Sequence, residues 1–144
     1  MVDFDERICK IVDIPYSYIC ELKYDGVAIS IIYENGQLVR AVTRGDGTQG
    51  DDVTRNIKTI NSVPLKLKGD FPDRFDIRGE IVLPFEGFNN MNKQRILEGE
   101  EPYRNPRNTA SGSLKLQDSN EVAKRPLDCL LYHMVADKLP IQTQ

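Results

Sequence analysis

Residues 27–44, with the sequence VAISIIYE-NG-QLVRAVTR, contain the strongest fold signal in the chain. Two β-prone runs flank Asn35-Gly36, the dipeptide most typical of a tight β-hairpin, because a type I′ turn needs positive φ at both positions. We therefore predict antiparallel strands over about 27–34 and 37–44. The apolar residues before them predict a further strand over about 17–24, so this part of the chain is expected to form an antiparallel meander.

The remaining sequence predicts helices packed on more antiparallel sheet. Strands are expected over Phe75 to Leu83, which Pro84 ends, and over Leu127 to Val135. The other expected elements are a helix over 3–12, a short helix over 51–58, an edge strand over 64–68, a helix over 85–97, a loop entering a short helix from Asn105, and a helical turn over 119–124. The fold class is therefore α+β, and 144 residues are enough for one domain.

Composition and charge limit the classes of function. The net charge of −3 and the pI of about 5.2 do not point to nucleic acid as a partner. The segment 104–125 is nevertheless locally basic, and a solvated surface is its default interpretation. Its basic side chains are Arg104, Arg107, Lys115, Lys124 and Arg125, against the carboxylates of Asp118 and Glu121.

The sequence contains no apolar run long enough to span a membrane and no signal-peptide pattern, so we expect a soluble intracellular protein. Cys9, Cys20 and Cys129 are scattered, match no metal-binding spacing and are expected to be reduced thiols. The single histidine, His133, lies in the last predicted strand, and we expect a structural role for it.

The segment Lys23-Tyr-Asp25-Gly26 is the best candidate for chemistry. Lys23 and Asp25 are two residues apart and would share one face of an extended strand. A lysine buried on such a sheet is costly, because burial disfavours the charged amine, and the cost is understandable if the amine is a nucleophile. The alternative is a surface lysine paired with the neighbouring aspartate.

Gly45, Gly47 and Gly50 satisfy the pattern G-x-G-x-x-G, and Asp70 follows at the spacing of a dinucleotide-binding fingerprint. Acidic side chains at the helix entrance would compete with a bound pyrophosphate. The preceding strand is also paired through a tight hairpin, whereas the fingerprint needs a parallel βαβ unit. We predict instead that the glycines allow a tight backbone path that presents Arg44.

Four polar elements are expected at strand ends or in loops, where a sheet can gather them around one pocket. They supply a nucleophile, cations suited to phosphate and carboxylates suited to ribose hydroxyls. These elements are Glu21/Lys23/Asp25, Arg44, Arg78-Gly79-Glu80 and Arg107.

The order and the residues of these motifs resemble those of the adenylation (nucleotidyltransferase) domain of bacterial NAD-dependent DNA ligases over nearly the whole chain. Four stretches carry the resemblance: CELKYDG at 20–26, TRGDG at 43–47, RGEIVLP at 78–84 and NPRNTASGSL at 105–114. The resemblance implies an ATP-grasp-like nucleotidyltransferase fold. It also implies that residues 1–144 are a single partial adenylation domain, a truncated fragment that ends before the last two nucleotidyltransferase motifs.

The resemblance further implies that Lys23 attacks the α-phosphate of NAD and gives a lysyl-AMP intermediate. AMP then passes to the 5′-phosphate of nicked DNA. Asp25 would orient Lys23 or make an outer-sphere contact with a metal ion. No residue of this chain is expected to ligate a metal ion directly. The fragment alone is expected to be inactive.

By the same resemblance, four residues bind the nucleotide. They are Lys23 itself, Arg44 near the ribose and phosphate, Glu80 at the ribose and Glu21 at the adenine edge. Arg107 would hold the phosphate of DNA or of AMP, to which its planar fork is suited. Lys115 stands where many family members have arginine and is a candidate for contacting DNA.

NAD and Mg²⁺ are the implied cofactors, with zinc only in other parts of the full-length family protein. Nicked double-stranded DNA and NAD or AMP are the implied partners, without a membrane, in the bacterial cytoplasm near the nucleoid. Three alternatives stay open: a nucleic-acid-binding or assembly module with a degenerate site, a dehydrogenase that uses the glycine loop, and an ATP-dependent ligase or capping-type nucleotidyltransferase.

Overall fold

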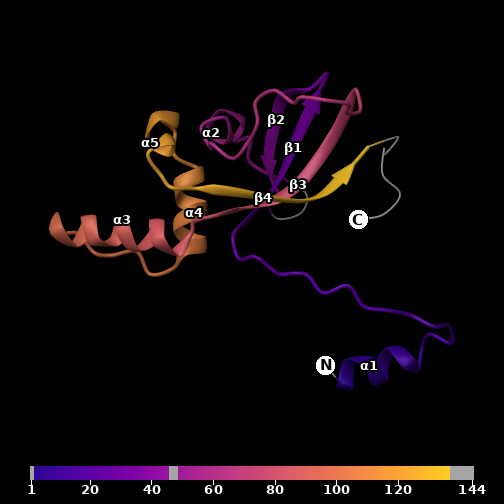
Figure 1. Cartoon of the computed structure of the whole chain (residues 1–144). Helices are drawn as coiled ribbons and strands as arrows, with labels where there is room; N and C mark the ends of the chain where they lie inside the picture. Colours follow the sequence, from indigo (N-terminus) through magenta and orange to yellow (C-terminus); the bar gives the residue numbers. More distant parts are fainter. Residues whose placement is uncertain (1, 46–48, 137–144) are drawn as a thin grey trace.

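The computed structural model describes residues 2–45 and 49–136. Its centre is a four-stranded sheet with the order β2-β1-β3-β4, in which every strand pair is antiparallel (Figure 1). The strands are β1 (Val27–Glu34), β2 (Gln37–Thr43), β3 (Arg74–Val82) and β4 (Asp128–Val135). The predicted α+β class is confirmed.

The predicted hairpin joins β1 to β2. Asn35 and Gly36 have φ angles of 48° and 73°, the left-handed values that a type I′ turn requires. A Cβ atom at Gly36 would also meet the Phe71 ring at 2.4 Å, so glycine serves both the turn and the packing beneath it.

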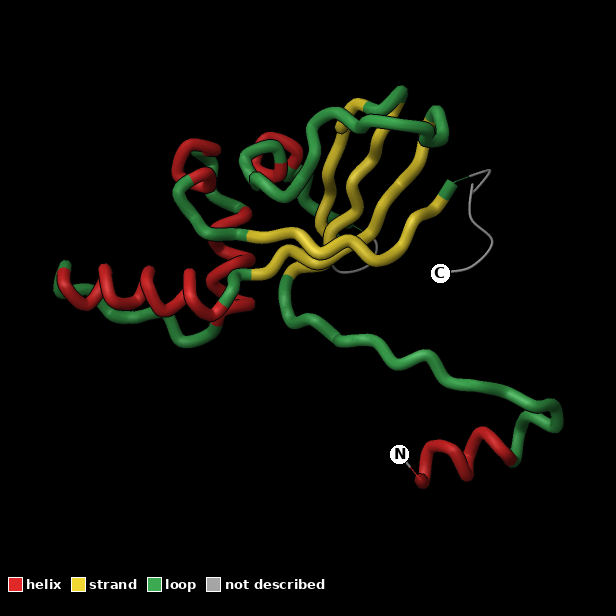
Figure 2. The backbone as a smooth tube through the Cα atoms, viewed as in Figure 1, coloured by secondary structure: helices red, strands yellow, loops and turns green. Residues whose placement is uncertain are grey.

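The predicted strand over 17–24 is wrong. Residues 15–25 have no strand structure, and they connect the sheet to a distant helix as an extended arm (Figure 2). The reason lies in the neighbouring strands. Val27 already pairs with Ile81, close to the end of β3, and β2 ends opposite Ile29, so the chain before Val27 has no strand beside it in the described part of the fold.

The helices lie mainly at one end of the sheet (Figure 1). They are α1 (Val2–Cys9), α2 (Thr54–Ile57), α3 (Phe85–Leu97), α4 (Pro106–Leu114) and α5 (Ser119–Ala123). The helix predicted over 85–97 is confirmed, and α4 begins where the Asn105 side chain accepts a hydrogen bond from the Asn108 backbone N–H. The edge strand predicted over 64–68 is reduced to one isolated bridge between Gln37 and Lys66.

The main core packs the sheet against α2 and α4. Ile31, Ile57 and Leu114 are fully buried in it. Tyr33 stacks on Phe75 with ring centroids 5.3 Å apart, and its hydroxyl donates to the Pro64 carbonyl. Burial raises the pKa of Tyr33 to about 12.

A smaller apolar cluster of Leu83, Phe88 and Ala110 fastens α3 to α4. A buried amide connects α2 to the end of α4, because Asn56 Nδ2 donates to the carbonyls of Leu114 and Leu116 at 2.7 and 2.8 Å. These contacts hold the middle and the C-terminal end of α4 in place.

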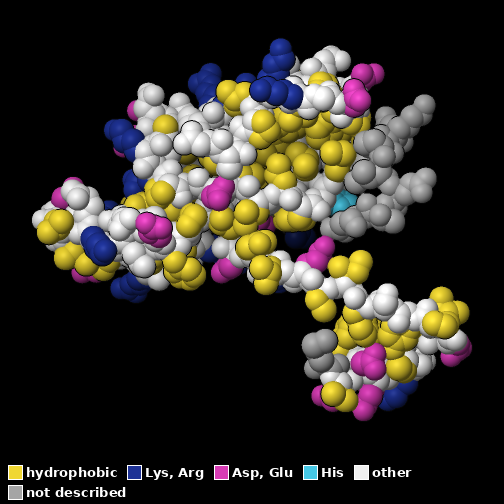
Figure 3. Space-filling model, in the orientation of Figure 1, with side chains coloured by type: hydrophobic (Ala, Val, Ile, Leu, Met, Phe, Trp, Pro, Cys, Tyr) yellow, Lys and Arg dark blue, Asp and Glu magenta, His cyan; other side chains and the backbone are white. Residues whose placement is uncertain are grey.

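The arm over 15–25 packs against helix α1. Tyr16 and Tyr18 both donate to the Asp5 carboxylate, at 3.0 and 2.8 Å, and Phe4 packs beside Tyr18. Several apolar side chains of the arm remain exposed (Figure 3). Among the described residues, no helix is long and apolar enough to cross a membrane.

Candidate functional site

The Lys-x-Asp-Gly segment is held against β3 at Gly26. The Gly26 backbone N–H donates to Glu80 Oε1 at 3.1 Å. A Cβ atom at Gly26 would lie 2.2 Å from the Ile81 carbonyl oxygen, so only glycine allows this approach. The glycine of the motif therefore sets where the residues before it, including Lys23, leave the sheet.

A cavity of about 630 Å³ lies beside this contact. Lys23, Glu21 and Glu80 line it together with Tyr132. Its volume falls within the range of about 300–1,000 Å³ that is usual for small-molecule sites. The structure thus brings together three of the predicted nucleotide-binding residues.

The environment of Lys23 differs from the expectation. Its side chain is exposed rather than buried on a sheet, because the segment that carries it is not a strand. Neither a hydrogen bond nor an ion pair joins the Lys23 amine to another described residue, so the alternative of a lysine paired with Asp25 is not observed either.

A second cavity, of about 760 Å³, adjoins the first through Tyr132, which lines both. Arg44, Arg78 and His133 line this second cavity. The predicted site residue Arg44 is therefore next to the Lys23 cavity but not in it. Two arginines give this neighbouring cavity the charge that suits phosphate.

Sequence reasoning missed Tyr132 and gave His133 a structural role, yet both side chains are exposed at the cavities. The cause is a register shift in the pairing of β3 with β4. Arg78 pairs with His133 and Gly79 with Leu131, which leaves Tyr132 as the extra residue. A Cβ atom at Gly79 would meet the Leu130 carbonyl at 2.5 Å, so the glycine of the Arg-Gly-Glu motif permits this close strand pairing.

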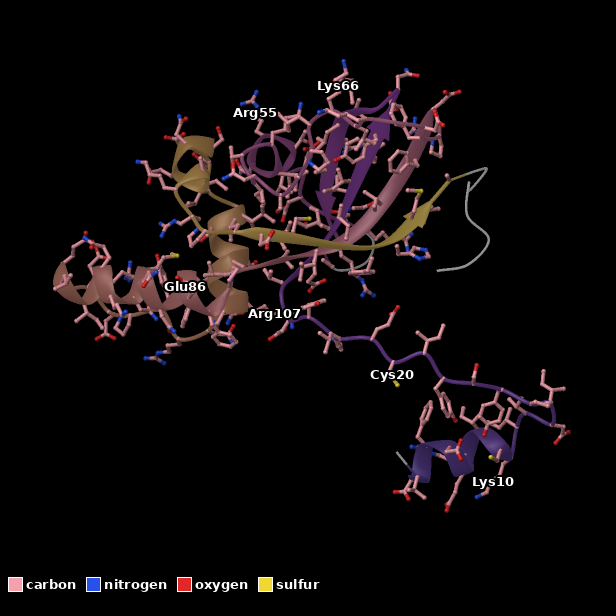
Figure 4. The ribbon with its side chains drawn as sticks, in the orientation of Figure 1. Lys10, Cys20, Arg55, Lys66, Glu86 and Arg107 are labelled. Carbon is pink, nitrogen blue, oxygen red and sulfur yellow. The ribbon has the colours of Figure 1, made fainter. Side chains whose placement is uncertain are left out.

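Asp25 pairs with Arg107, which lies in the first turn of α4, near the point where the arm joins β1 (Figure 4). Arg107 Nη1 lies 3.0 Å from Asp25 Oδ1, and the two side chains are 58% and 68% exposed. The predicted residues Asp25 and Arg107 are thus neighbours, although they are more than 80 positions apart in the sequence.

Lys115 lies elsewhere. Its amine pairs with Asp51 at 2.6 Å and lines a separate cavity of about 710 Å³ with residues of α2. The structure therefore does not bring Lys115 to the Lys23 cavity.

The glycine-rich loop is only partly described. Asp46 and Gly47 of the TRGDG stretch lie outside the described residues. A Cβ atom at Gly45 would meet the Gln49 carbonyl, and one at Gly50 would meet the Thr43 carbonyl, so these glycines permit a tight loop. The strand before this loop is antiparallel to β1, which rules out the βαβ unit of the dehydrogenase alternative.

No three His, Cys, Asp or Glu side chains among the described residues are grouped so that they could hold a metal ion. Mg²⁺ consequently stays a prediction from the resemblance.

Comparison with known proteins agrees with the motifs. Residues 1–144 match the family described as NAD-dependent DNA ligase adenylation domain. The chain is 70% identical to a DNA ligase of Flavobacterium psychrophilum over 99% of its length, and 65% identical to a DNA ligase of Flavobacterium johnsoniae over 100% of its length. The aligned region is 22% of each relative. The chain spans about a fifth of the curated relatives that it matches, and it belongs to the family of NAD-dependent DNA ligase adenylation domains.

Proposed function

We propose that the protein carrying this chain seals nicks in DNA and that Lys23 accepts AMP from NAD in the first step. The Lys23 amine loses a proton and forms a bond to the α-phosphorus, while the bond to nicotinamide mononucleotide breaks. The 5′-phosphate at a nick then takes the AMP from the lysine. The adjacent 3′-hydroxyl finally displaces AMP and closes the phosphodiester.

The observation that carries the proposal is the shared cavity of Lys23 and Glu80, which come from distant parts of the sequence. A nucleophilic amine and a carboxylate at one nucleotide-sized cavity fit an adenylate whose phosphate meets the amine and whose ribose meets the carboxylate. Glu80 Oε1 accepts a hydrogen bond from the Gly26 backbone N–H, so the second carboxylate oxygen can accept a hydrogen bond from a ribose hydroxyl.

The adjoining cavity supplies the positive charge. Arg44 and Arg78 could hold the phosphates of NAD from this side, with Tyr132 between the two cavities. Because Lys23 is exposed, we expect the bound nucleotide itself to exclude water from the amine.

In this scheme Asp25 positions the segment that carries Lys23 and does not act on the Lys23 amine. Its pairing with Arg107 links the lysine loop to the first turn of α4. Arg107 can then exchange its carboxylate partner for a phosphate of AMP or DNA.

Intact-mass measurement tests the proposal on the full-length protein that carries this chain. Incubation with NAD should add the mass of one adenylate, and Lys23→Ala should abolish the addition. Lys66→Ala, at the far end of the sheet, is the matched control (Figure 4). Adenylation with ATP but not NAD would favour the ATP-dependent alternative. DNA binding without any adenylation would favour a nucleic-acid-binding module.

We expect residues 1–144 alone to neither self-adenylate nor seal nicks. The resemblance assigns the lysines that hold the α-phosphate to two motifs that follow this segment in the family. Incubation of the 144-residue chain with labelled NAD should leave it unlabelled, and strong labelling of Lys23 would contradict this expectation.

A further inference from the structure

We infer that Arg78 and His133 together bind one phosphate of NAD, and that this contact weakens when the His133 side chain loses its proton. The inference rests on the proposed function, because it takes NAD as the substrate of the Lys23 cavity. It gives a binding role to the single histidine of the chain, which the adenylation scheme leaves unused.

Four side chains form a row across one face of the sheet. Ser30 on β1 pairs with Val42 on β2 and with Arg78 on β3. Arg78 pairs in turn with His133 on β4. Residues that lie directly opposite on neighbouring strands point to the same face, and all four line the cavity of about 760 Å³ that adjoins the Lys23 cavity. The row therefore sets Arg78 and His133 side by side at the wall of this cavity.

The register shift in the pairing of β3 with β4 creates this arrangement. Tyr132 is an extra residue on β4, so His133 lies opposite Arg78. Without the shift, the phenol of Tyr132 would stand in that place. A Cβ atom at Gly79 would lie 2.5 Å from the Leu130 carbonyl oxygen, so the two strands approach this closely only with glycine at the shift. The backbone thus holds an imidazole opposite a guanidinium group.

Neither side chain of the pair has a counter-ion. Within residues 2–45 and 49–136, Arg78 and His133 form no side-chain hydrogen bond and no ion pair. The residues that line the cavity include no carboxylate, and Arg44 adds a further positive charge to them. Positive groups directly opposite on neighbouring strands repel each other. An anion bound between them removes this repulsion, and a phosphate accepts hydrogen bonds from both.

Few titratable or charged groups face His133 from the elements beside it. They are Arg78, Asp76 and Glu80 on β3, Arg44 after β2 and Tyr132 on β4 itself. Asp76 and Glu80 lie two residues to either side of Arg78, on the same face of β3. Neither carboxylate lines the cavity, and neither forms an ion pair with a described residue. Arginine stays charged in proteins, whereas histidine is the residue type that changes its charge between about pH 5 and 8.

The position of the pair fits the second phosphate of NAD. In the proposed scheme the α-phosphate lies at Lys23, and the diphosphate extends beyond it. The cavity with Arg78 and His133 adjoins the Lys23 cavity through Tyr132, so it can receive this phosphate while the adenylate stays at Lys23. The pair makes no bond to phosphorus. It therefore acts on the binding of NAD and not on the rate of the chemical step.

Single-turnover self-adenylation of the full-length protein tests the inference, with the NAD concentration varied. His133→Gln should raise the half-saturating NAD concentration about tenfold at about pH 6 and leave it nearly unchanged at about pH 8.5. A charged donor binds phosphate more strongly than a neutral amide does, and the diphosphate diester of NAD keeps its charge over this range. The maximal rate at each pH should equal that of the unmodified protein, because the pair binds ground state and transition state alike.

His133→Lys is the rescue variant. It keeps a positive charge at both pH values, so its half-saturating NAD concentration should not rise between them. Lys66→Gln removes a charge at the far end of the sheet and is the matched control, which should behave as the unmodified protein (Figure 4). Because His133 is exposed, we expect its variants to fold.

A His133→Gln variant with an unchanged half-saturating NAD concentration at about pH 6 would overturn the inference. So would an equal rise at both pH values, which would give His133 a structural role. Binding of inorganic pyrophosphate at about pH 6, measured by calorimetry on the full-length protein, needs no adenylation; His133→Gln should weaken it about tenfold, and equal affinity would refute the contact. If the unmodified protein does not self-adenylate, the proposed function fails and this titration alone decides on the pair.

Discussion

Replacement of Gly26 by alanine tests the contact that holds the Lys23 segment on β3. The added methyl group would lie 2.2 Å from the Ile81 carbonyl oxygen and 3.0 Å from Glu80 Cγ, so the backbone has to move. Movement breaks the hydrogen bond from the Gly26 N–H to the Glu80 carboxylate. A lost hydrogen bond to a charged group costs about 1.5–3 kcal/mol, and an overpacked contact costs about 1–3 kcal/mol more.

The combined cost of roughly 2.5–6 kcal/mol is an upper limit for the loss of global stability, because the arm before Gly26 has no strand partner among the described residues and can swing outward instead. We therefore expect the free energy of unfolding to fall by less than this sum. NAD-dependent self-adenylation of the full-length protein should be lost, since Lys23 then leaves the Glu80 cavity. Urea unfolding followed by circular dichroism measures the first quantity, and intact mass measures the second.

Gly112→Ala is the matched control for stability. A Cβ atom at Gly112 meets nothing within 4 Å, and alanine in the interior of α4 should add about 0.5–1 kcal/mol. If Gly26→Ala kept full self-adenylation and normal stability, the account of the motif glycine would be refuted.

Three further predictions concern single interactions. Asp25→Asn should change the free energy of unfolding by less than about 1 kcal/mol, because its pair with Arg107 is exposed, and a larger loss in urea unfolding would show that the pair is structural. Asn56→Ala leaves two carbonyls at the end of α4 without their donor and should lower stability by about 1–3 kcal/mol, measured in the same way. Above pH 10 the unfolded chain ionises tyrosine while Tyr33, with a pKa of about 12, stays neutral. The contribution of Tyr33 to stability should therefore be complete below pH 10 and fall by about 1.4 kcal/mol per pH unit between 10 and 12. Buried Cys129, whose pKa burial also raises to about 12, should add to this fall from about pH 9, and Tyr33→Phe should remove only the tyrosine part.

Local signals account for the elements that the sequence predicts well. The Asn35-Gly36 turn and the helix that follows Pro84 depend on residues close in the chain, and both are present. The strand predicted over 17–24 fails because a strand needs a partner, and the end of β3 near Ile81 leaves none beside that segment in the described fold. Strand pairing is a long-range property that the local pattern does not report.

The candidate site likewise has features that the local sequence predicts and features that depend on strand pairing. Lys23, Glu21 and Glu80 could be predicted from motifs and share a cavity, but the exposure of Lys23 depends on the missing strand. Tyr132 could not be found from the sequence, because its position at the two cavities follows from the register shift between β3 and β4.

Peptide mapping by mass spectrometry after incubation of the full-length protein with NAD tests the central claim most directly. The account predicts a single adenylate on the Nζ atom of Lys23. An adenylate on a different residue, or an unmodified Lys23 in a protein that seals nicks, would contradict it.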